Sequence, residues 1–143
     1  MLDAPPVYRH VVRFSEVDAA GIAFFTRLFE WCHHAWEDAL HRALGPWFQA
    51  MGREGWGLPL VHADAAFRRP ARLGDALTVS IAGLRLDGGR LRIRFTIDGV
   101  DDVRHAEIEH VHAFVDLKTF RRVDPPADVL ERLRAAGLEI ADE

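Results

Sequence analysis

The chain of 143 residues has one cysteine, Cys32, and only two serines, Ser15 and Ser80. A single cysteine excludes an internal disulfide framework, and its place in a helical apolar pattern predicts a buried thiol, not a nucleophile. Neither serine lies in a G-x-S-x-G segment, which argues against a Ser-His-Asp hydrolase. The G-x-x-x-x-G-K-S/T and G-x-G-x-x-G segments that bind nucleotide phosphates are missing too, so chemistry on nucleoside triphosphates is not expected.

Long apolar runs and a strong charge of one sign are also missing. No stretch approaches membrane-spanning length, and no basic segment followed by an apolar one opens the chain, so we expect a cytoplasmic protein without a membrane partner. The formal net charge is -4, and no nucleic-acid-binding module is recognisable, so nucleic acid is not an expected partner. The length and the apolar content of 49% predict one domain, residues 1–143, around a single core.

Hydrophobic periodicity predicts one long helix among strands. Residues 7–14 alternate as a strand does, and from Phe25 apolar residues recur every three or four positions until Gly45-Pro46 ends the helix. A loop follows over 46–59, then four strands over 60–68, 76–86, 90–97 and 103–115, with a hairpin turn at Asp87-Gly88-Gly89. A short helix over 127–136 follows the last strand. This order predicts an α+β fold in which an antiparallel sheet curls around one central helix, and whose edges favour pairing with a second copy.

The junction between the first strand and the long helix carries the strongest chemical signal. Asp18 lies three positions before Gly21, close to the start of the helix. A helix N-terminus presents unpaired N–H groups and the positive end of the macrodipole, so a reactive carboxylate there shares its site with donors for an oxyanion. The alternative is that Asp18 only caps the helix. Glu16 is expected to be no more than an ion-pair partner in the loop.

The histidines do not form a recognised metal-binding set. His33 and His34 are adjacent and point in different directions on a helix. His110 and His112 share one strand face, but no cysteine or carboxylate spacing completes a ligand set, so structural histidines are expected and no metal. His33 and His62 are candidates for a substrate pocket, with simple packing as the alternative.

Arginines gather at two places in the sequence. Their forked donors match phosphate groups well, although a solvated sheet face is the alternative for the second group. The first group, Arg68, Arg69 and Arg72, surrounds Pro70, and the second, Arg90, Arg92 and Arg94, lies on one face of a predicted strand.

Three segments resemble a known family. The junction E-V-D-A-A-G-I-A-F-F resembles the signature of the hotdog-fold thioesterases of the 4-hydroxybenzoyl-CoA type. The helix segment C-H-H-A-W-E-D-A-L and the segment L-P-L-V-H-A-D-A-A-F-R-R-P-A-R-L-G-D-A-L are more similar to the branch of 1,4-dihydroxy-2-naphthoyl-CoA hydrolases of menaquinone and phylloquinone synthesis. The resemblance covers about residues 7–126.

The resemblance implies an acyl-CoA hydrolase without a cofactor, assembled as a homodimer or homotetramer with its sites between subunits. By position Asp18 matches the catalytic aspartate, as nucleophile or as general base. Phe25 matches the residue whose N–H polarises the thioester carbonyl, and Gly21 lies in the same helix start. His33 stands where the 4-hydroxybenzoyl enzymes have an aspartate that binds the substrate hydroxyl. The other substrate-binding candidates are His62, Arg68, Arg69 and Arg90.

Two alternatives to a naphthoyl-CoA hydrolase stay open. One is hydrolysis of 4-hydroxybenzoyl-CoA or of short- and medium-chain acyl-CoA esters. The other, of a different class, is a non-catalytic module that binds acyl-CoA, which would have no need of a carboxylate at Asp18.

Overall fold

The computed structural model of the chain describes residues 7–142, without the side chains of residues 47, 48, 50 and 142. The first six residues, on which the expectation of no leader segment partly rests, and residue 143 lie outside the described part. The main sheet contains the six strands β1 (Val7–Val11), β3 (Leu60–Phe67), β4 (Ala76–Asp87), β5 (Arg90–Asp98), β6 (Arg104–His112) and β8 (Ile140–Asp142). The helices are α1 (Phe25–Leu44), α2 (Trp47–Glu54) and α3 (Ala127–Ala135), and β2 (Trp56–Gly57) pairs with β7 (Val115–Asp116) apart from the main sheet.

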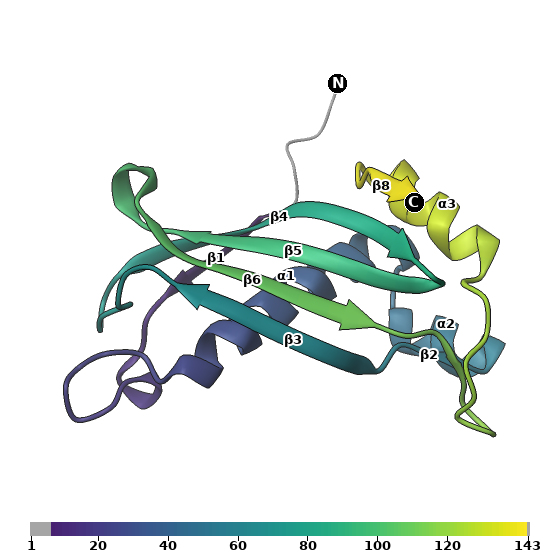
Figure 1. Cartoon of the computed structure of the whole chain (residues 1–143), viewed down its shortest axis with the longest axis horizontal. Helices are drawn as coiled ribbons and strands as arrows, with labels where there is room; N and C mark the ends of the chain where they lie inside the picture. The colour runs from purple at the N-terminus through teal and green to yellow at the C-terminus, as the bar shows by residue number, and fades with distance from the viewer. Residues whose placement is uncertain (1–6, 143) are drawn as a thin grey trace.

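The sheet curves across α1, as Figure 1 shows. Its order is β1-β4-β5-β6-β3, with antiparallel neighbours throughout. The short strand β8 runs parallel to β4 at Leu84–Leu86, beyond the part of β4 that pairs with β1. One long strand, β3, therefore forms an edge of the sheet, and the predicted α+β arrangement of a sheet around a central helix is confirmed.

The core lies between α1 and the concave face of the sheet. One side of α1 is buried along its whole length, from Leu28 through Trp31 and Trp36 to Leu44. Alternate residues of β5 face it, because successive strand side chains point to opposite faces of the sheet. They are Leu91, Ile93, Phe95 and Ile97, each at most 1% exposed. Each such side chain contributes roughly 1.5–3 kcal/mol by leaving water, so this layer fixes where α1 begins and which way it faces.

Four features of the fold differ from the sequence prediction. The predicted loop over 46–59 contains α2 and β2, because Pro46 stands at the N-cap of α2 and Gly55, at φ +73°, ends it in the left-handed region. The first strand ends at Val11, and the chain continues into a short 3₁₀ turn, Phe14–Glu16. The last long strand ends at His112, before the separate strand β7. The strand β8 was not predicted, because three residues are too few to show the alternation of apolar and polar side chains that marks a strand.

Two histidines of β6, His110 and His112, lie in this core, and each is 2% exposed. They face α1 on the same side of β6 as Ile108, and the predicted structural role of both stays a prediction. The pKa of both imidazoles is lowered to about 4, mainly by burial. The proximity of His112 and His33 adds to the lowering for His110, and for His112 the proximity of His33 adds to it while the hydrogen bond to the Leu58 carbonyl opposes it. Both rings are therefore neutral at neutral pH.

We predict that the protein loses stability as the pH falls from about 6.5 to about 4. In that interval the unfolded imidazoles bind protons and the folded ones do not, so each histidine lowers the free energy of unfolding by up to about 1.4 kcal/mol per pH unit. Urea unfolding between pH 4 and 7 should show a shallower pH slope for His110→Leu than for the natural protein. The exposed His41 supplies the control variant His41→Leu, and an equal change of slope in both variants would contradict the assignment.

Candidate active site

The loop between β1 and α1 is a small closed hairpin. Val17 and Ala23 form an antiparallel bridge, the Asp18 N–H donates to the Ile22 carbonyl at 2.9 Å, and the Gly21 N–H donates to the Asp18 carbonyl at 3.0 Å. Gly21 has φ +75°, a conformation that glycine adopts without strain. The N–H of Gly21 is thus used inside the loop, and what Gly21 contributes is the turn that brings Asp18 back toward the helix start.

The turn between β3 and β4 holds this loop in place. The Ala23 N–H donates to the Ala71 carbonyl at 2.7 Å, and the Leu73 N–H donates to the Gly21 carbonyl at 3.1 Å. Ile22 also forms a bridge with Arg72. A loop fixed by backbone hydrogen bonds on both sides can hold a side chain in one geometry, which a catalytic group requires.

Asp18 presents an exposed carboxylate on this loop. Its Oδ1 accepts hydrogen bonds from the N–H groups of Ala20 at 2.8 Å and Ile22 at 3.3 Å. Its Oδ2 has no hydrogen-bond partner within residues 7–142. The N-cap of α1 is Phe24, and no side chain caps it. Asp18 therefore does not cap the helix, and the alternative considered for it is wrong.

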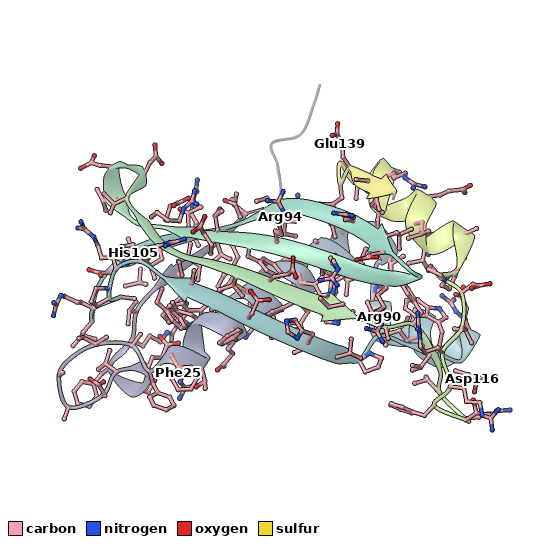
Figure 2. The ribbon with its side chains drawn as sticks, in the orientation of Figure 1. Phe25, Arg90, Arg94, His105, Asp116 and Glu139 are labelled. Carbon is pink, nitrogen blue, oxygen red and sulfur yellow. The ribbon has the colours of Figure 1, made fainter. Side chains whose placement is uncertain are left out.

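The first turn of α1 lies directly after the loop. The Phe24 N–H donates to the Glu16 carbonyl at 2.9 Å, whereas the Phe25 N–H has no acceptor in the described part of the chain. The Phe25 ring is 52% exposed, and it lies at the end of the sheet where the loop is found (Figure 2). The junction thus combines a carboxylate, of which one oxygen accepts no hydrogen bond from residues 7–142, with an N–H at the positive end of a 20-residue helix.

Glu16 is buried under this junction and joins three elements. Its Oε1 accepts from the Arg13 N–H at 2.8 Å and contacts His10 Nε2 at 2.7 Å, while its Oε2 accepts from Trp31 Nε1 at 2.8 Å. Burial by itself raises the pKa of the Glu16 carboxyl, but the hydrogen bonds from Arg13, Trp31 and His10 outweigh it, so the pKa lies below its usual value. Glu16 is thus a charged anchor that ties β1, the loop and α1 together.

The sequence pattern predicts only an ion pair in the loop for Glu16, and the structure shows this additional anchoring role. A signal was present: Trp31 lies on the apolar side of α1, and a buried indole N–H needs an acceptor. His10 points to the same side of β1 as the buried Val12, so it also lacks solvent as a partner. Glu16 is the carboxylate that can serve both.

A cavity of about 350 Å³ opens beside Phe25. Arg68 and Arg69 line it together with Ile22 and Phe67. Arg68 also pairs with Glu107 across the strands at 2.9 Å, and both side chains are largely exposed. Two of the predicted substrate-binding arginines thus lie next to the candidate catalytic junction.

Three predicted residues lie farther from the junction. His33 is exposed on α1, about two turns after Phe25. His62 lies on the convex face of β3, where it contacts Asp64 at 3.0 Å, because its neighbour Ala63 faces the concave side opposite His110. Arg90 lies at the other end of the sheet from Phe25 (Figure 2). One copy of the chain therefore does not bring His62 or Arg90 to Asp18.

Neither a thiol nor a metal cluster competes with this site. Cys32 is fully buried, as predicted, and burial raises the pKa of its thiol, so it stays protonated. Among the described residues, no three side chains of His, Cys, Asp or Glu are grouped so as to hold a metal ion. No described helix is long and apolar enough to cross a membrane. Cytoplasmic location, independence of a cofactor and the lack of a nucleic-acid partner stay predictions.

Comparison with known proteins decides the family. The profile of the thioesterase-like superfamily matches residues 12–133, which include the loop, α1 and the sheet up to α3. The chain belongs to the thioesterase-like superfamily. It is 39% identical to a 1,4-dihydroxy-2-naphthoyl-CoA hydrolase of Synechococcus sp. (strain WH7803), over 89% of this chain and 86% of that protein. It is 35% identical to the enzyme of the same name from Prochlorococcus marinus (strain MIT 9303), over 91% of this chain and 90% of that protein.

Solved structures of thioesterases have the same fold as this superfamily member. A 1,4-dihydroxy-2-naphthoyl-CoA thioesterase from Synechocystis superposes with a TM-score of 0.79 at 24% identity, covering 90% of this chain and 94% of that one. The predicted hotdog fold is confirmed.

We predict that Glu16→Gln lowers the free energy of unfolding by about 2–4 kcal/mol, because the amide leaves a buried donor of Arg13 or Trp31 without an acceptor. Urea unfolding at pH 7 measures the loss. Glu30→Gln is the control, because Glu30 forms an exposed pair with Arg27 at 3.2 Å, and such pairs contribute about 0–1 kcal/mol. Equal losses in the two variants would remove the anchoring role of Glu16.

Proposed function

We propose that this superfamily member is a cofactor-independent acyl-CoA thioesterase. It hydrolyses an aromatic acyl-CoA, with 1,4-dihydroxy-2-naphthoyl-CoA as the leading substrate, to the free acid and CoA. The observation that carries the proposal is the exposed Asp18 carboxylate, with one oxygen held by the loop, at the junction where the Phe25 N–H has no acceptor among the described residues. The hydrolases with which the chain shares 35–39% identity support the choice of substrate.

The geometry suits attack on a thioester. The carbonyl oxygen accepts a hydrogen bond from the Phe25 N–H, where the helix dipole stabilises the charge that develops on it. In one route the Asp18 carboxylate attacks the carbonyl carbon, the C–S bond breaks, and water then hydrolyses the mixed anhydride. In the other route Asp18 removes a proton from a water molecule that attacks the same carbon. Both routes release the CoA thiolate, which takes up a proton, and both regenerate the carboxylate.

The active enzyme is a pair of copies joined at β3. This edge strand exposes about half of the side chains of Leu60, Val61 and Phe67. An antiparallel pairing of two β3 strands would continue the sheet and satisfy the free backbone groups of both edges. Because the pairing reverses one copy, it places the Phe25 end of each copy beside the Arg90 end of the other (Figure 2).

This arrangement gives Arg90 a role that it cannot have within one copy. Arg122 lies beside it, because Arg122 Nη2 donates to the Gly88 carbonyl in the β4–β5 turn at 2.6 Å. Arg90 and Arg122 of one copy, and Arg68 and Arg69 of the other, would then lie on either side of the thioester. Guanidinium groups bind phosphates well, so we assign the CoA phosphates to these arginines.

We predict that Asp18→Asn leaves the fold and the assembly intact and lowers kcat by at least about a hundredfold, because it removes the attacking or proton-accepting group. Hydrolysis is followed by release of free CoA thiol, and circular dichroism verifies folding. Asp128→Asn, at an exposed carboxylate on α3, should retain full activity. Full turnover by well-folded Asp18→Asn would contradict the role of Asp18, whereas no turnover by the natural protein would favour the alternative of a non-catalytic acyl-CoA-binding module.

We predict that the purified protein is a dimer or tetramer, and that activity per subunit falls when dilution produces monomers. The reason is that the proposed site takes groups from two copies. Light scattering and turnover should be measured over the same range of concentrations. A monomer as active as the assembly would contradict this arrangement.

We also predict a preference for a hydroxynaphthoyl ester over hexanoyl-CoA in kcat/KM. A bicyclic ring gains apolar contact, and a site that pairs a buried hydroxyl loses about 1–3 kcal/mol when a plain chain binds. His33→Ala should reduce the preference, whereas His41→Ala, farther along the exposed side of α1, should not. Equal kcat/KM values for the two esters would leave only a general acyl-CoA thioesterase.

A further inference from the structure

Three imidazole nitrogens in the core lack hydrogen-bond partners among the described residues. They are Nδ1 and Nε2 of His110 and Nε2 of His112. Native proteins pair nearly all of their buried polar atoms, because each unpaired one loses its hydrogen bonds to water without replacement. Three unpaired nitrogens at one place in the core need an explanation. A bound ligand whose polar groups pair with them is one explanation.

The tautomer of His112 is fixed by its surroundings. Its Nδ1 lies 3.0 Å from the Leu58 carbonyl, so Nδ1 carries the hydrogen and donates it. The unpaired Nε2 is then an acceptor. His110 is neutral, so one of its two unpaired nitrogens donates and the other accepts. Together the two rings offer what a hydroxyl group needs, since a hydroxyl both donates and accepts.

A row of aromatic rings connects these histidines with the candidate catalytic junction. Phe25 contacts Phe67 with ring centroids 6.5 Å apart, and Phe67 contacts Phe29 at 6.5 Å. Phe29 stacks on His110 at 6.0 Å with an angle of 10° between the planes. Along α1, Phe29 lies about 6 Å beyond Phe25, which is similar to the length of a fused pair of aromatic rings.

The edge strand carries small side chains beside His110. Ala63 is the direct partner of His110 in the β3–β6 pair, and Ala65 is the partner of Ile108. Both alanines face the concave side and are partly exposed, so from Ala63 to Ala65 the concave side of β3 carries only methyl groups. His33 on α1 is near enough to both histidines to lower their pKa values. A flat acyl group that starts at the Phe25 N–H can therefore pass along Phe29 and Ala63 toward His110.

We propose that His110 forms the polar end of the acyl pocket and pairs with a hydroxyl group on the aromatic ring of the substrate, assisted by His112. The assignment rests on the proposed function and extends it to the feature of the substrate that is recognised. It makes His110 a residue that determines specificity. The class of ligand is a hydroxylated bicyclic aryl acid or its CoA ester.

The first experiment compares kcat/KM for 1,4-dihydroxy-2-naphthoyl-CoA and for 2-naphthoyl-CoA, which lacks the hydroxyl groups. His110→Leu should reduce the ratio of the two values about tenfold or more, mainly by slowing the hydroxylated ester. The control is His105→Leu, because His105 is also buried with an unpaired Nδ1 but lies at the opposite end of β6. An unchanged ratio in well-folded His110→Leu would overturn the proposal.

A second experiment measures binding without hydrolysis. Calorimetry with 1,4-dihydroxy-2-naphthoate should show tighter binding than with 2-naphthoate, and His110→Leu should abolish the difference. Ala63→Leu, which fills the approach without touching a polar group, should weaken binding of both acids. If the natural protein hydrolyses neither ester but discriminates between the acids through His110, the proposed activity fails and the assignment of His110 stands. If the acids bind equally or not at all, the assignment of His110 fails.

Discussion

The geometry of the candidate catalytic junction depends on one buried carboxylate, that of Glu16. Its side chain receives hydrogen bonds from the chain after β1 and from Trp31 in α1, and its own carbonyl accepts from Phe24 at the helix start. A charge in the interior is costly unless it is fully paired, so this arrangement is stable only when strand, loop and helix are all in register. The position of Asp18 relative to the Phe25 N–H follows from that constraint. The proposed catalytic carboxylate, Asp18, can then stay exposed, because Glu16 holds the junction together.

The two faces of the sheet differ in polarity, and the alternation of apolar and polar residues along the strands already indicates the difference. The concave face carries the apolar residues of β5 and the histidines of β6, and it meets α1. The convex face carries cross-strand ion pairs such as that of Arg92 with Asp87 and Glu109 at 2.8 and 2.9 Å. This supports the solvated-face interpretation of the stripe that contains Arg92. The arginines near the catalytic junction belong to turns and not to this face.

Most of the fold could be predicted, because α1 and the long strands have clear periods of 3.6 and 2 residues. The helix α2 and the strand β8 could not, since eight and three residues are too few to show a period and packing decides their state. Phe25, Arg68 and Arg69 line one cavity next to the loop of Asp18, because backbone hydrogen bonds join that loop to the turn after β3. His62 and Arg90 were also predicted as site residues. The sequence does not show on which face of the sheet His62 lies or at which end of the sheet Arg90 lies, because the strand register decides both. The anchoring role of Glu16 involves partners up to 15 positions away, so no local pattern reports it.

The unequal edges of the sheet limit how copies of the chain can assemble. On the β4 side the edge is divided between β1, of five residues, and β8, of three, which meet different halves of β4. Short and interrupted edges are poor templates for a further strand, whereas β3 offers eight residues in one run. A sheet with only one edge strand long enough to pair can add one neighbouring strand and no more. In the proposed assembly, edge pairing therefore closes at two copies, and the asymmetry on which the proposed site depends would prevent growth into a fibre.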